Sequence, residues 1–213
     1  MIRLHEMFHS IQGESTYAGR PCAFVRTAGC NLECRYCDQP DARGPGEEVP
    51  FDEVLSRVAS YNCKLVEVTG AEPLWQLRGF DLIEALCQRG YETLVETNGT
   101  IDVARVDPRA TLIMDIKTPS SGFSDKTHWE NIDHLKPGKD EVKFVIADKA
   151  DHKWALNVVR KHGLAERFTV LLSPVFGVLD PKDLSKWILE DSLNVRLNLQ
   201  LHKYIWGPEV KGV

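Results

Sequence analysis

Three cysteines lie close together in the first fifth of the chain. Cys30, Cys34 and Cys37 are spaced CxxxCxxC. An iron–sulfur cluster used only for structure or electron transfer is normally closed by four protein ligands. Three thiolates can hold three irons of a cubane [4Fe-4S] cluster and leave the fourth iron open to a small molecule. The spacing therefore predicts a cluster that binds a ligand directly.

The cysteines also allow other interpretations. A structural zinc site needs four ligands, usually in two pairs; no second pair lies near the motif, although His5 or His9 could fold back to it. The remaining cysteines, Cys22, Cys63 and Cys87, stand alone in apolar surroundings. We expect these three to be buried as small hydrophobic side chains.

Composition favours a soluble enzyme with one core. The chain has 213 residues, of which 43% are hydrophobic and 27% charged, so a single domain over residues 1–213 is expected. A net charge of -5 without a basic stripe argues against a nucleic-acid surface. No signal peptide or membrane span is expected, because the N-terminus lacks an apolar segment and no run of eighteen apolar residues occurs. An exposed cluster requires a reducing compartment, so we predict a cytoplasmic location.

Short apolar runs alternate with segments of helical length, which is an α/β pattern. Continuous apolar runs suit parallel strands covered on both faces. Strands are predicted at residues 23–27, 64–69, 93–96, 111–116, 141–147, 167–172 and 195–201. Helices are predicted at residues 51–60, 79–89, 150–162 and 180–190, the last capped by Asp180 with Pro181 at its first position. A complete eight-unit barrel takes about 250 residues, so we predict a partial, open (β/α) barrel.

Polar residues gather where the predicted strands end. Active sites of such barrels form at the C-terminal ends of the strands. Arg26, Thr69, Glu96 and the pair Asp115 and Lys117 occupy these positions, so we expect them to face one mouth. Lys143 places a charge in an apolar strand and could either reach this mouth, where Glu96 is a candidate partner, or extend to solvent.

Several segments resemble one family of the radical S-adenosylmethionine (SAM) superfamily, the 7-carboxy-7-deazaguanine synthases. The resemblance runs from about residue 5 to the C-terminus. It is carried by FHSIQGES (residues 8–15), FVRTAGCNL (24–32), TGAEP (69–73), ETNG (96–99) and QLHKYIWG (200–207), of which the last is the most specific.

The resemblance implies a fold of the radical SAM type and a lyase reaction in queuosine biosynthesis. In that family 6-carboxy-5,6,7,8-tetrahydropterin is contracted to 7-carboxy-7-deazaguanine with loss of ammonia. A 5'-deoxyadenosyl radical takes a hydrogen atom from C6 of the substrate and later recovers it, so SAM acts as a catalytic cofactor. The family also implies a flavodoxin- or ferredoxin-type reductant and a homodimer.

The resemblance also assigns residues to the cofactor. The three cysteines hold the cluster, and the SAM site is expected to comprise Tyr36, Cys37, Asp38, Ala71, Asp115, Ile116, Lys117 and Ser173. The family usually has glycine at the position of Ala71, and the added methyl group is tolerated unless the backbone there needs a positive φ.

The substrate residues implied by the resemblance are Ile11, Gln12, Gly13, Glu14, Arg26, Thr69 and Val213. Glu14 is a candidate acceptor for the guanidine-like N–H edge of the pterin. Arg26 is suited to forked recognition of a carboxylate, although a structural salt bridge is the alternative. His202 is a further candidate through the C-terminal motif.

The position after Asp38 departs from the family. Relatives commonly carry threonine or serine there, whose hydroxyl helps to hold a magnesium ion, whereas this chain has Gln39. A glutamine oxygen can bind Mg²⁺, but its longer arm would move the ion or require an intervening water. Gln39 is therefore the predicted Mg²⁺ residue.

Two other functions remain open. A glycyl-radical activase shares the SAM cluster and similar early motifs, but it would recognise a protein loop and consume SAM. The second alternative is an electron carrier or sensor that holds a cluster but catalyses no reaction. In such a protein the polar residues at the strand ends would have no common function.

Overall fold

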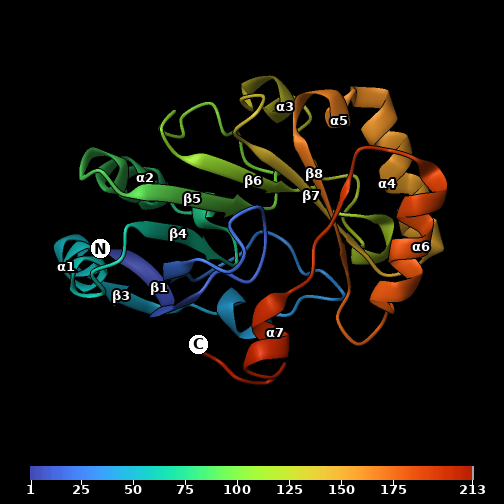
Figure 1. Ribbon diagram of the computed structural model, residues 1–213. Helices are drawn as coiled ribbons and strands as arrows, with labels where there is room; N and C mark the ends of the chain where they lie inside the picture. Colours follow the sequence, from blue (N-terminus) through green and yellow to red (C-terminus); the bar gives the residue numbers. More distant parts are fainter. Residues whose placement is uncertain (213) are drawn as a thin grey trace.

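The computed structural model describes residues 1–212 and contains one mixed sheet (Figure 1). The nine strands that the described residues form lie in the order β3-β1-β2-β4-β5-β6-β7-β8-β9. Their bounds are β1 Ile2–Ile11, β2 Pro21–Thr27, β3 Glu47–Val49, β4 Leu65–Gly70, β5 Glu92–Thr97, β6 Thr111–Asp115, β7 Glu141–Ile146, β8 Thr169–Pro174 and β9 Arg196–Leu197.

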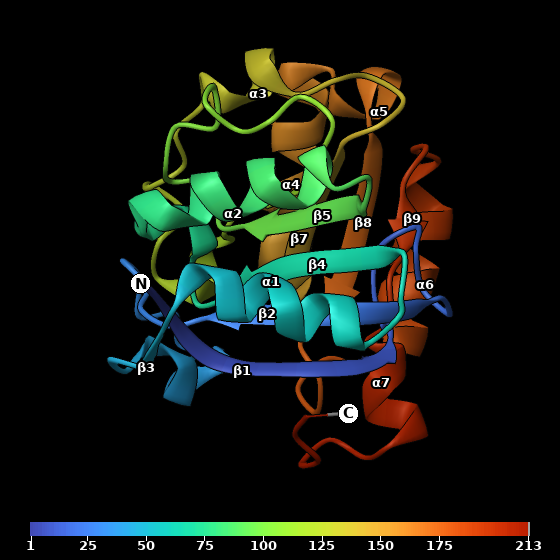
Figure 2. The same cartoon turned by 90° about the vertical axis from the view of Figure 1, so that its left-hand side faces the viewer.

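Helices follow most of the parallel strands and cover the outer face of the sheet (Figures 1 and 2). They are α1 Phe51–Ser60, α2 Leu77–Gln88, α3 Asn131–His134, α4 Lys149–His162, α5 Leu164–Arg167, α6 Pro181–Asp191 and α7 Leu201–Ile205, with 3-10 turns η1 Pro40–Arg43, η2 Pro73–Trp75 and η3 Pro119–Ser121. The cap predicted for α6 is present, since the side chain of Asp180 accepts a hydrogen bond from the N–H of Lys182 at 2.8 Å. No helix within residues 1–212 is long and apolar enough to span a membrane.

The predicted open barrel is confirmed. From β2 to β9 all neighbouring strands run parallel, and the sheet ends at β3 and β9 without closing. The antiparallel strand β1 between β2 and β3 was not predicted. Its residues alternate between apolar and polar side chains and are mostly half-buried, so it lacks the continuous apolar run that marks the other strands.

The predicted strand at residues 195–201 is wrong in extent. Only Arg196 and Leu197 pair with β8, and the chain then turns into α7. Asn198 makes this turn, because its N–H donates to the carbonyl of Leu172 at 2.9 Å and its side chain donates to the hydroxyl of Ser173 at 2.8 Å. Polar bonds to β8 thus replace further strand pairing.

Alternation along each strand gives the sheet two different faces. On β4, Val66 and Val68 pack into the main core beneath the helices, whereas Leu65 belongs to a second cluster on the concave face. That smaller cluster comprises Cys22, Phe24, Leu65, Leu94 and Ile113. Cys22 and Cys87 are buried as expected and Cys63 is half-buried.

The loop between β1 and β2 fills part of the concave face (blue in Figure 1). Tyr17 packs against the smaller apolar cluster. Thr16 donates its backbone N–H and its hydroxyl to the buried carboxylate of Glu141 on β7, and the N–H of Ser15 donates to Asn198 at 2.9 Å. The loop therefore connects β7 on one side of the open barrel to the segment after β9, and it packs on the concave face of the sheet.

Candidate active site

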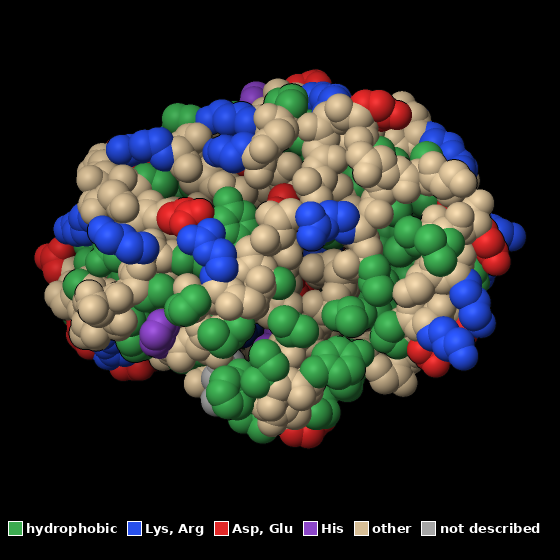
Figure 3. All heavy atoms as spheres, viewed as in Figure 1, with side chains coloured by type: hydrophobic (Ala, Val, Ile, Leu, Met, Phe, Trp, Pro, Cys, Tyr) green, Lys and Arg blue, Asp and Glu red, His purple; other side chains and the backbone are tan. Residues whose placement is uncertain are grey.

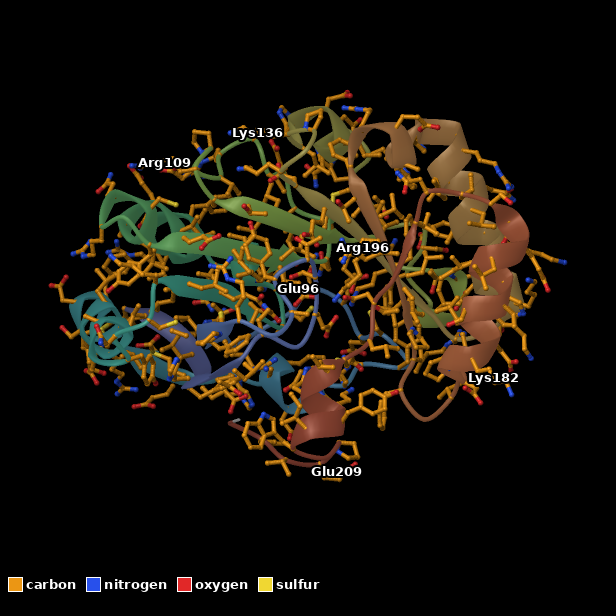
Figure 4. The ribbon with its side chains drawn as sticks, in the orientation of Figure 1. Glu96, Arg109, Lys136, Lys182, Arg196 and Glu209 are labelled. Carbon is orange, nitrogen blue, oxygen red and sulfur yellow. The ribbon has the colours of Figure 1, made fainter. Side chains whose placement is uncertain are left out.

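A pocket opens at the C-terminal ends of the parallel strands. Its lining includes the cysteine motif, the start of the loop after β1 and part of the C-terminal segment. The predicted strand-end residues Arg26, Thr69, Glu96, Asp115 and Lys117 all line it. The prediction that these side chains share one mouth is confirmed, and Figure 4 shows Glu96 near the centre of the molecule among densely packed side chains.

The three cysteines lie together at one side of this pocket and are half-buried. The N–H of Leu32 donates to Sγ of Cys30 at 3.4 Å, and Nδ2 of Asn98 lies 3.8 Å from the same sulfur. Burial raises the pKa of Cys34, while the nearby charge of Lys117 opposes that rise. These N–H donors and the ammonium group are suited to stabilising thiolates.

The donor set fits a cluster held by three thiolates. No three His, Cys, Asp or Glu side chains in residues 1–212 converge on a point that one metal ion could occupy. A cubane cluster does not require such convergence, because each thiolate binds a different iron. The zinc interpretation lacks its fourth ligand, since the described lining includes neither His5 nor His9, and His9 stacks on Tyr61 with ring centroids 6.0 Å apart.

The turn after β4 explains how Ala71 replaces the usual glycine. Gly70 has φ +120°, and a Cβ there would lie 2.4 Å from the carbonyl oxygen of Thr27. Ala71 lines the pocket and is not among the described non-glycine residues with positive φ. The condition for tolerating alanine is therefore met, because the strained position is Gly70.

Glu72 was not predicted, although it organises this side of the site. It is fully buried and accepts hydrogen bonds from the N–H of Asn98 at 2.6 Å, the N–H of Leu74 at 3.0 Å and the hydroxyl of Thr97 at 2.9 Å. Burial raises the pKa of Glu72 to about 7 against the effect of these donors. Through Asn98, Glu72 positions an amide next to the cysteine motif.

Lys143 reaches the pocket from β7, which decides between its two predicted orientations. Its side chain is 5% exposed, and its Nζ lies 3.0 Å from Glu14, contacts Glu96 and lies 3.7 Å from Asp115. Burial lowers the pKa of Lys143, but the three carboxylates outweigh this effect, so the pKa lies well above its ordinary value. For Glu14, burial raises the pKa and the charge of Lys143 reverses the shift, leaving it below its ordinary value.

Asp115 at the end of β6 and Lys117 two residues later both face the pocket. Lys117 contacts Asp115 at 3.0 Å, and both line the site. Ile116 between them does not line it, because its side chain is fully buried in the main core.

The Tyr36 hydroxyl lies 3.0 Å from the hydroxyl of Thr118, and burial raises the pKa of Tyr36 to about 12.

The C-terminal segment covers one side of the pocket. The N–H of Leu201 donates to the carbonyl of Gly13 at 2.8 Å, and Gln200 donates to Glu14 at 3.0 Å. Gln200 and Lys203 also donate to Asp38, at 3.0 and 3.1 Å. Burial raises the pKa of Asp38, but the charge of Lys203 reverses this and lowers it to about 2. Asp38 therefore joins the cysteine loop to α7.

Arg26 forms an ion pair and still lines the pocket. Its Nε lies 2.9 Å from Glu6, which is the salt bridge considered as the alternative. Its side chain also lines the pocket and lies over the ring of Phe8, 5.7 Å from the centroid. The ion pair with Glu6 orients the guanidinium group without removing it from the site.

The other predicted residues fall in three groups. Those that line the pocket are Ile11, Gln12, Gly13, Gln39, Ser173 and His202. Ile116 does not line the pocket, because its side chain lies in the main core. Val213 lies outside the described residues.

Glu67 also lines the pocket and was not predicted from the sequence. It is 4% exposed and accepts a hydrogen bond from the side-chain amide of Gln12. A sequence signal existed, because a glutamate within the apolar strand β4 is as unusual as the lysine in β7.

The surface of α7 is apolar (Figure 3). Hydrophobic side chains gather over this helix and the neighbouring loop; they are Phe176, Tyr204, Ile205, Trp206 and Val210. Lys203 extends over the ring of Phe176 at 5.2 Å, and Phe176 packs edge-on against Tyr204.

Comparison with known proteins shows the superfamily of the chain. The model of the radical SAM superfamily matches residues 24–184. The crystal structure of QueE from Escherichia coli shares the fold with a TM-score of 0.75, 20% identity and 94% coverage of both chains. The chain belongs to the radical SAM superfamily.

Full-length relatives identify the family within it. The 7-carboxy-7-deazaguanine synthase of Chlorobaculum tepidum is 47% identical over 214 residues, which cover 100% of this chain and 97% of the relative. The 7-carboxy-7-deazaguanine synthase of Koribacter versatilis is 42% identical over 227 residues, which cover 100% of both chains. The chain belongs to the 7-carboxy-7-deazaguanine synthase family.

Proposed function

We propose that this chain converts 6-carboxy-5,6,7,8-tetrahydropterin to 7-carboxy-7-deazaguanine with release of ammonia, a carbon–nitrogen lyase step that supplies queuosine and related 7-deazapurines. One observation carries the proposal: a single pocket contains the three-cysteine motif, the Gln12–Glu14 loop and the charged strand ends. The family relation stated above supports the same reaction.

The residues on the cluster side form the proposed cofactor site. When bound there, the [4Fe-4S] cluster and SAM supply the 5'-deoxyadenosyl radical that takes a hydrogen atom from the substrate. The side chains assigned to SAM are Tyr36, Asp38, Ala71, Asp115, Lys117 and Ser173, all of which line the pocket, together with Cys37. Ile116 could contribute only main-chain atoms because its side chain is in the core.

The residues on the loop side form the proposed substrate site. Arg26, oriented by Glu6, presents a guanidinium group that can bind the substrate carboxylate. Glu14 presents a carboxylate that Lys143 and Gln200 hold in place, and it can accept N–H groups of the pterin. Ile11, Gln12, Gly13 and Thr69 complete the lining, and Val213 remains a candidate outside the described residues.

Three further properties belong to this proposal. Gln39 lines the pocket beside the cysteine loop and is the residue proposed to bind Mg²⁺. A flavodoxin- or ferredoxin-type protein is the proposed electron donor. A homodimer in the cytoplasm is the third property. The exposed apolar side chains on α7 support the dimer.

The test is anaerobic turnover with defined products. The reconstituted, dithionite-reduced protein is incubated with SAM, Mg²⁺ and the pterin, and the products are separated by mass-resolved chromatography. We expect 7-carboxy-7-deazaguanine in molar excess over the SAM supplied. Production of 5'-deoxyadenosine without this product would retain radical SAM chemistry and point to another substrate, as for an activase. No SAM cleavage after reduction would favour an electron carrier.

A further inference from the structure

Glu67 stands apart from the other carboxyl groups of the pocket. Glu14, Glu96 and Asp115 each contact the ammonium group of Lys143. In the part of the chain that the structure describes, Glu67 forms no ion pair, and its one side-chain partner is the neutral amide of Gln12. A buried carboxylate without a cation is costly, so this environment favours the neutral acid.

Two acidic neighbours also favour the neutral form of Glu67, and Lys143 opposes them. Glu14 in the loop after β1 and Glu96 on the neighbouring strand β5 are the two negatively charged neighbours. Lys143 on β7 is the opposing cation. Cys22 on β2 is a buried thiol. Burial raises the pKa of Glu67 to about 8, and the charges of Glu96 and Glu14 add to that rise. Electrostatics thus agrees with the contact geometry.

The polar groups of Gln12 are already hydrogen-bonded within the protein. Its side-chain oxygen accepts the N–H of Glu14 at 3.0 Å, and its side-chain amide donates to Glu67. Its backbone N–H and carbonyl bond to Arg20 and Gly19, both at 2.8 Å. The side chain of Gln12 therefore orients Glu67 and Glu14, and these two acids face the pocket.

A neutral Glu67 differs chemically from its neighbours. One carboxyl oxygen of Glu67 accepts a hydrogen bond from the side-chain N–H of Gln12, and the other oxygen, which carries the proton, can donate one. A pterin ring carries N–H donors beside a carbonyl and ring-nitrogen acceptors. An ionised Glu14 can accept from the N–H groups, but only a protonated acid can donate to the acceptors.

We propose that Glu67 is a specificity-determining residue of the pterin site, a neutral carboxyl group that Gln12 orients and that donates its O–H to an acceptor atom of the pterin ring. The proposal rests on the proposed function. It explains why a glutamate occupies a concave-face position of β4 although, among the described residues, it forms no ion pair with a lysine or arginine. Ionisation of Glu67 removes the donor and adds a charge that repels the acceptor.

The experiment compares Glu67→Gln, Glu67→Leu and the wild-type protein. Glutamine keeps a donor and an acceptor at every pH, whereas leucine removes both. Binding of 6-carboxy-5,6,7,8-tetrahydropterin to the unreduced holoenzyme is measured by anaerobic calorimetry from pH 6.5 to 9. Glu48→Gln, an exposed glutamate on β3, is the matched control.

The expected results differ for each variant. The wild-type protein and Glu48→Gln lose affinity about tenfold toward pH 9, as expected for loss of one proton. Glu67→Gln binds within about threefold of the wild type at pH 6.5 and keeps its affinity to pH 9, whereas Glu67→Leu is weakened about tenfold or more at pH 6.5. An alkaline loss in Glu67→Gln equal to that of the wild type overturns the proposal, as does unchanged affinity in Glu67→Leu.

A second measurement does not require the substrate. The infrared difference spectrum between the wild-type protein and Glu67→Gln at pH 6.5 is expected to show the band of a neutral carboxyl group, and a carboxylate band there overturns the proposal. If the wild-type protein makes the product but Glu67 fails these tests, only the specificity proposal is lost. If the wild-type protein neither binds nor converts the pterin, the proposed function fails and the specificity proposal fails with it.

Discussion

The imidazole ring of His202 occupies the space that a side chain at Gly13 would need. A Cβ built on Gly13 would lie 2.1 Å from Nδ1 of His202 and 3.0 Å from its backbone nitrogen. The N–H of Leu201 donates to the Gly13 carbonyl at 2.8 Å in the same contact. The loop after β1 and the C-terminal segment, which are almost a full chain length apart, therefore fit together at the wall of the pocket.

Gly13→Ala is expected to displace this contact. The methyl group and the imidazole ring cannot occupy the same space, so the C-terminal segment should exchange amide hydrogens faster at residues 199–206 and kcat/KM should fall about tenfold or more. Gly13→Ala combined with His202→Ala removes the clash with the ring but not the close approach to the backbone nitrogen of residue 202, so it should restore slow exchange in part. Gly44→Ala, at a glycine without positive φ, is the control. Unchanged exchange in Gly13→Ala would contradict the structural relationship.

Lys143→Met is expected to destabilise the fold strongly at neutral pH. Removing the ammonium group leaves Glu14, Glu96 and Asp115 without their shared cation, and breaking a buried pair in this way costs about 3–5 kcal/mol. The pKa of Glu14 lies below its ordinary value because of Lys143. The stability that this shift contributes is present above the unfolded-state pKa and is lost as pH falls through the folded-state pKa.

The loss in Lys143→Met should therefore shrink between pH 7 and pH 4. Urea unfolding at both values measures it. Lys126→Met, at an exposed lysine that pairs with the neighbouring Asp125, should change the free energy of unfolding by less than about 0.5 kcal/mol. A loss in Lys143→Met that is small or independent of pH would argue against a buried charge cluster.

Glu67→Gln is expected to change how stability depends on pH. The pKa of Glu67 is raised to about 8, whereas an unfolded glutamate titrates near pH 4.3. Between these values the folded state keeps a proton that the unfolded state has released, so this group lowers stability as pH rises, by up to about 1.4 kcal/mol per pH unit. Glu67→Gln lacks this slope, so its stability relative to the wild type should increase from pH 5 to pH 8. Parallel stability curves would be the contrary result.

Replacing any cysteine of the motif should abolish the cluster. Cys30→Ala, Cys34→Ala and Cys37→Ala each leave two thiolates, and we expect iron and sulfide contents after reconstitution to be close to zero. The circular dichroism spectrum should stay that of the folded protein, because the cysteine loop packs outside the two apolar clusters. Cys63→Ala is the control and should keep a full complement of iron. Full iron content in a motif variant would require another ligand.

Magnesium dependence should respond to Gln39. Turnover is expected to fall when a chelator removes Mg²⁺, and Gln39→Ala should raise the Mg²⁺ concentration for half-maximal activity about tenfold. Gln39→Thr introduces a short hydroxyl ligand and should lower that concentration below the value for Gln39→Ala. Turnover unaffected by saturating chelator would eliminate the proposed role.

Local sequence patterns accounted for the centre of the fold. The predicted helix at residues 51–60 has the observed bounds of α1, and the central strands were placed to within one or two residues. Apolar runs and capping residues reflect interactions within a few residues of one another, so they can be read without the tertiary structure. The edges were harder, because β1 alternates apolar and polar residues, and Asn198 after β9 bonds through its side chain to β8 and to the loop after β1.

By itself the sequence determined the residue types that could do chemistry and the strand ends that carry them, because the cysteine spacing is local and parallel strands share one active edge. Only the tertiary structure decided which partners each side chain has. It placed Lys143 against three carboxylates, Glu67 against the neutral amide of Gln12 and Gly13 against the ring of His202. Burial and charge at these positions arise from segments far apart in the chain, and such neighbours are fixed by how the sheet curves and which loops cross it.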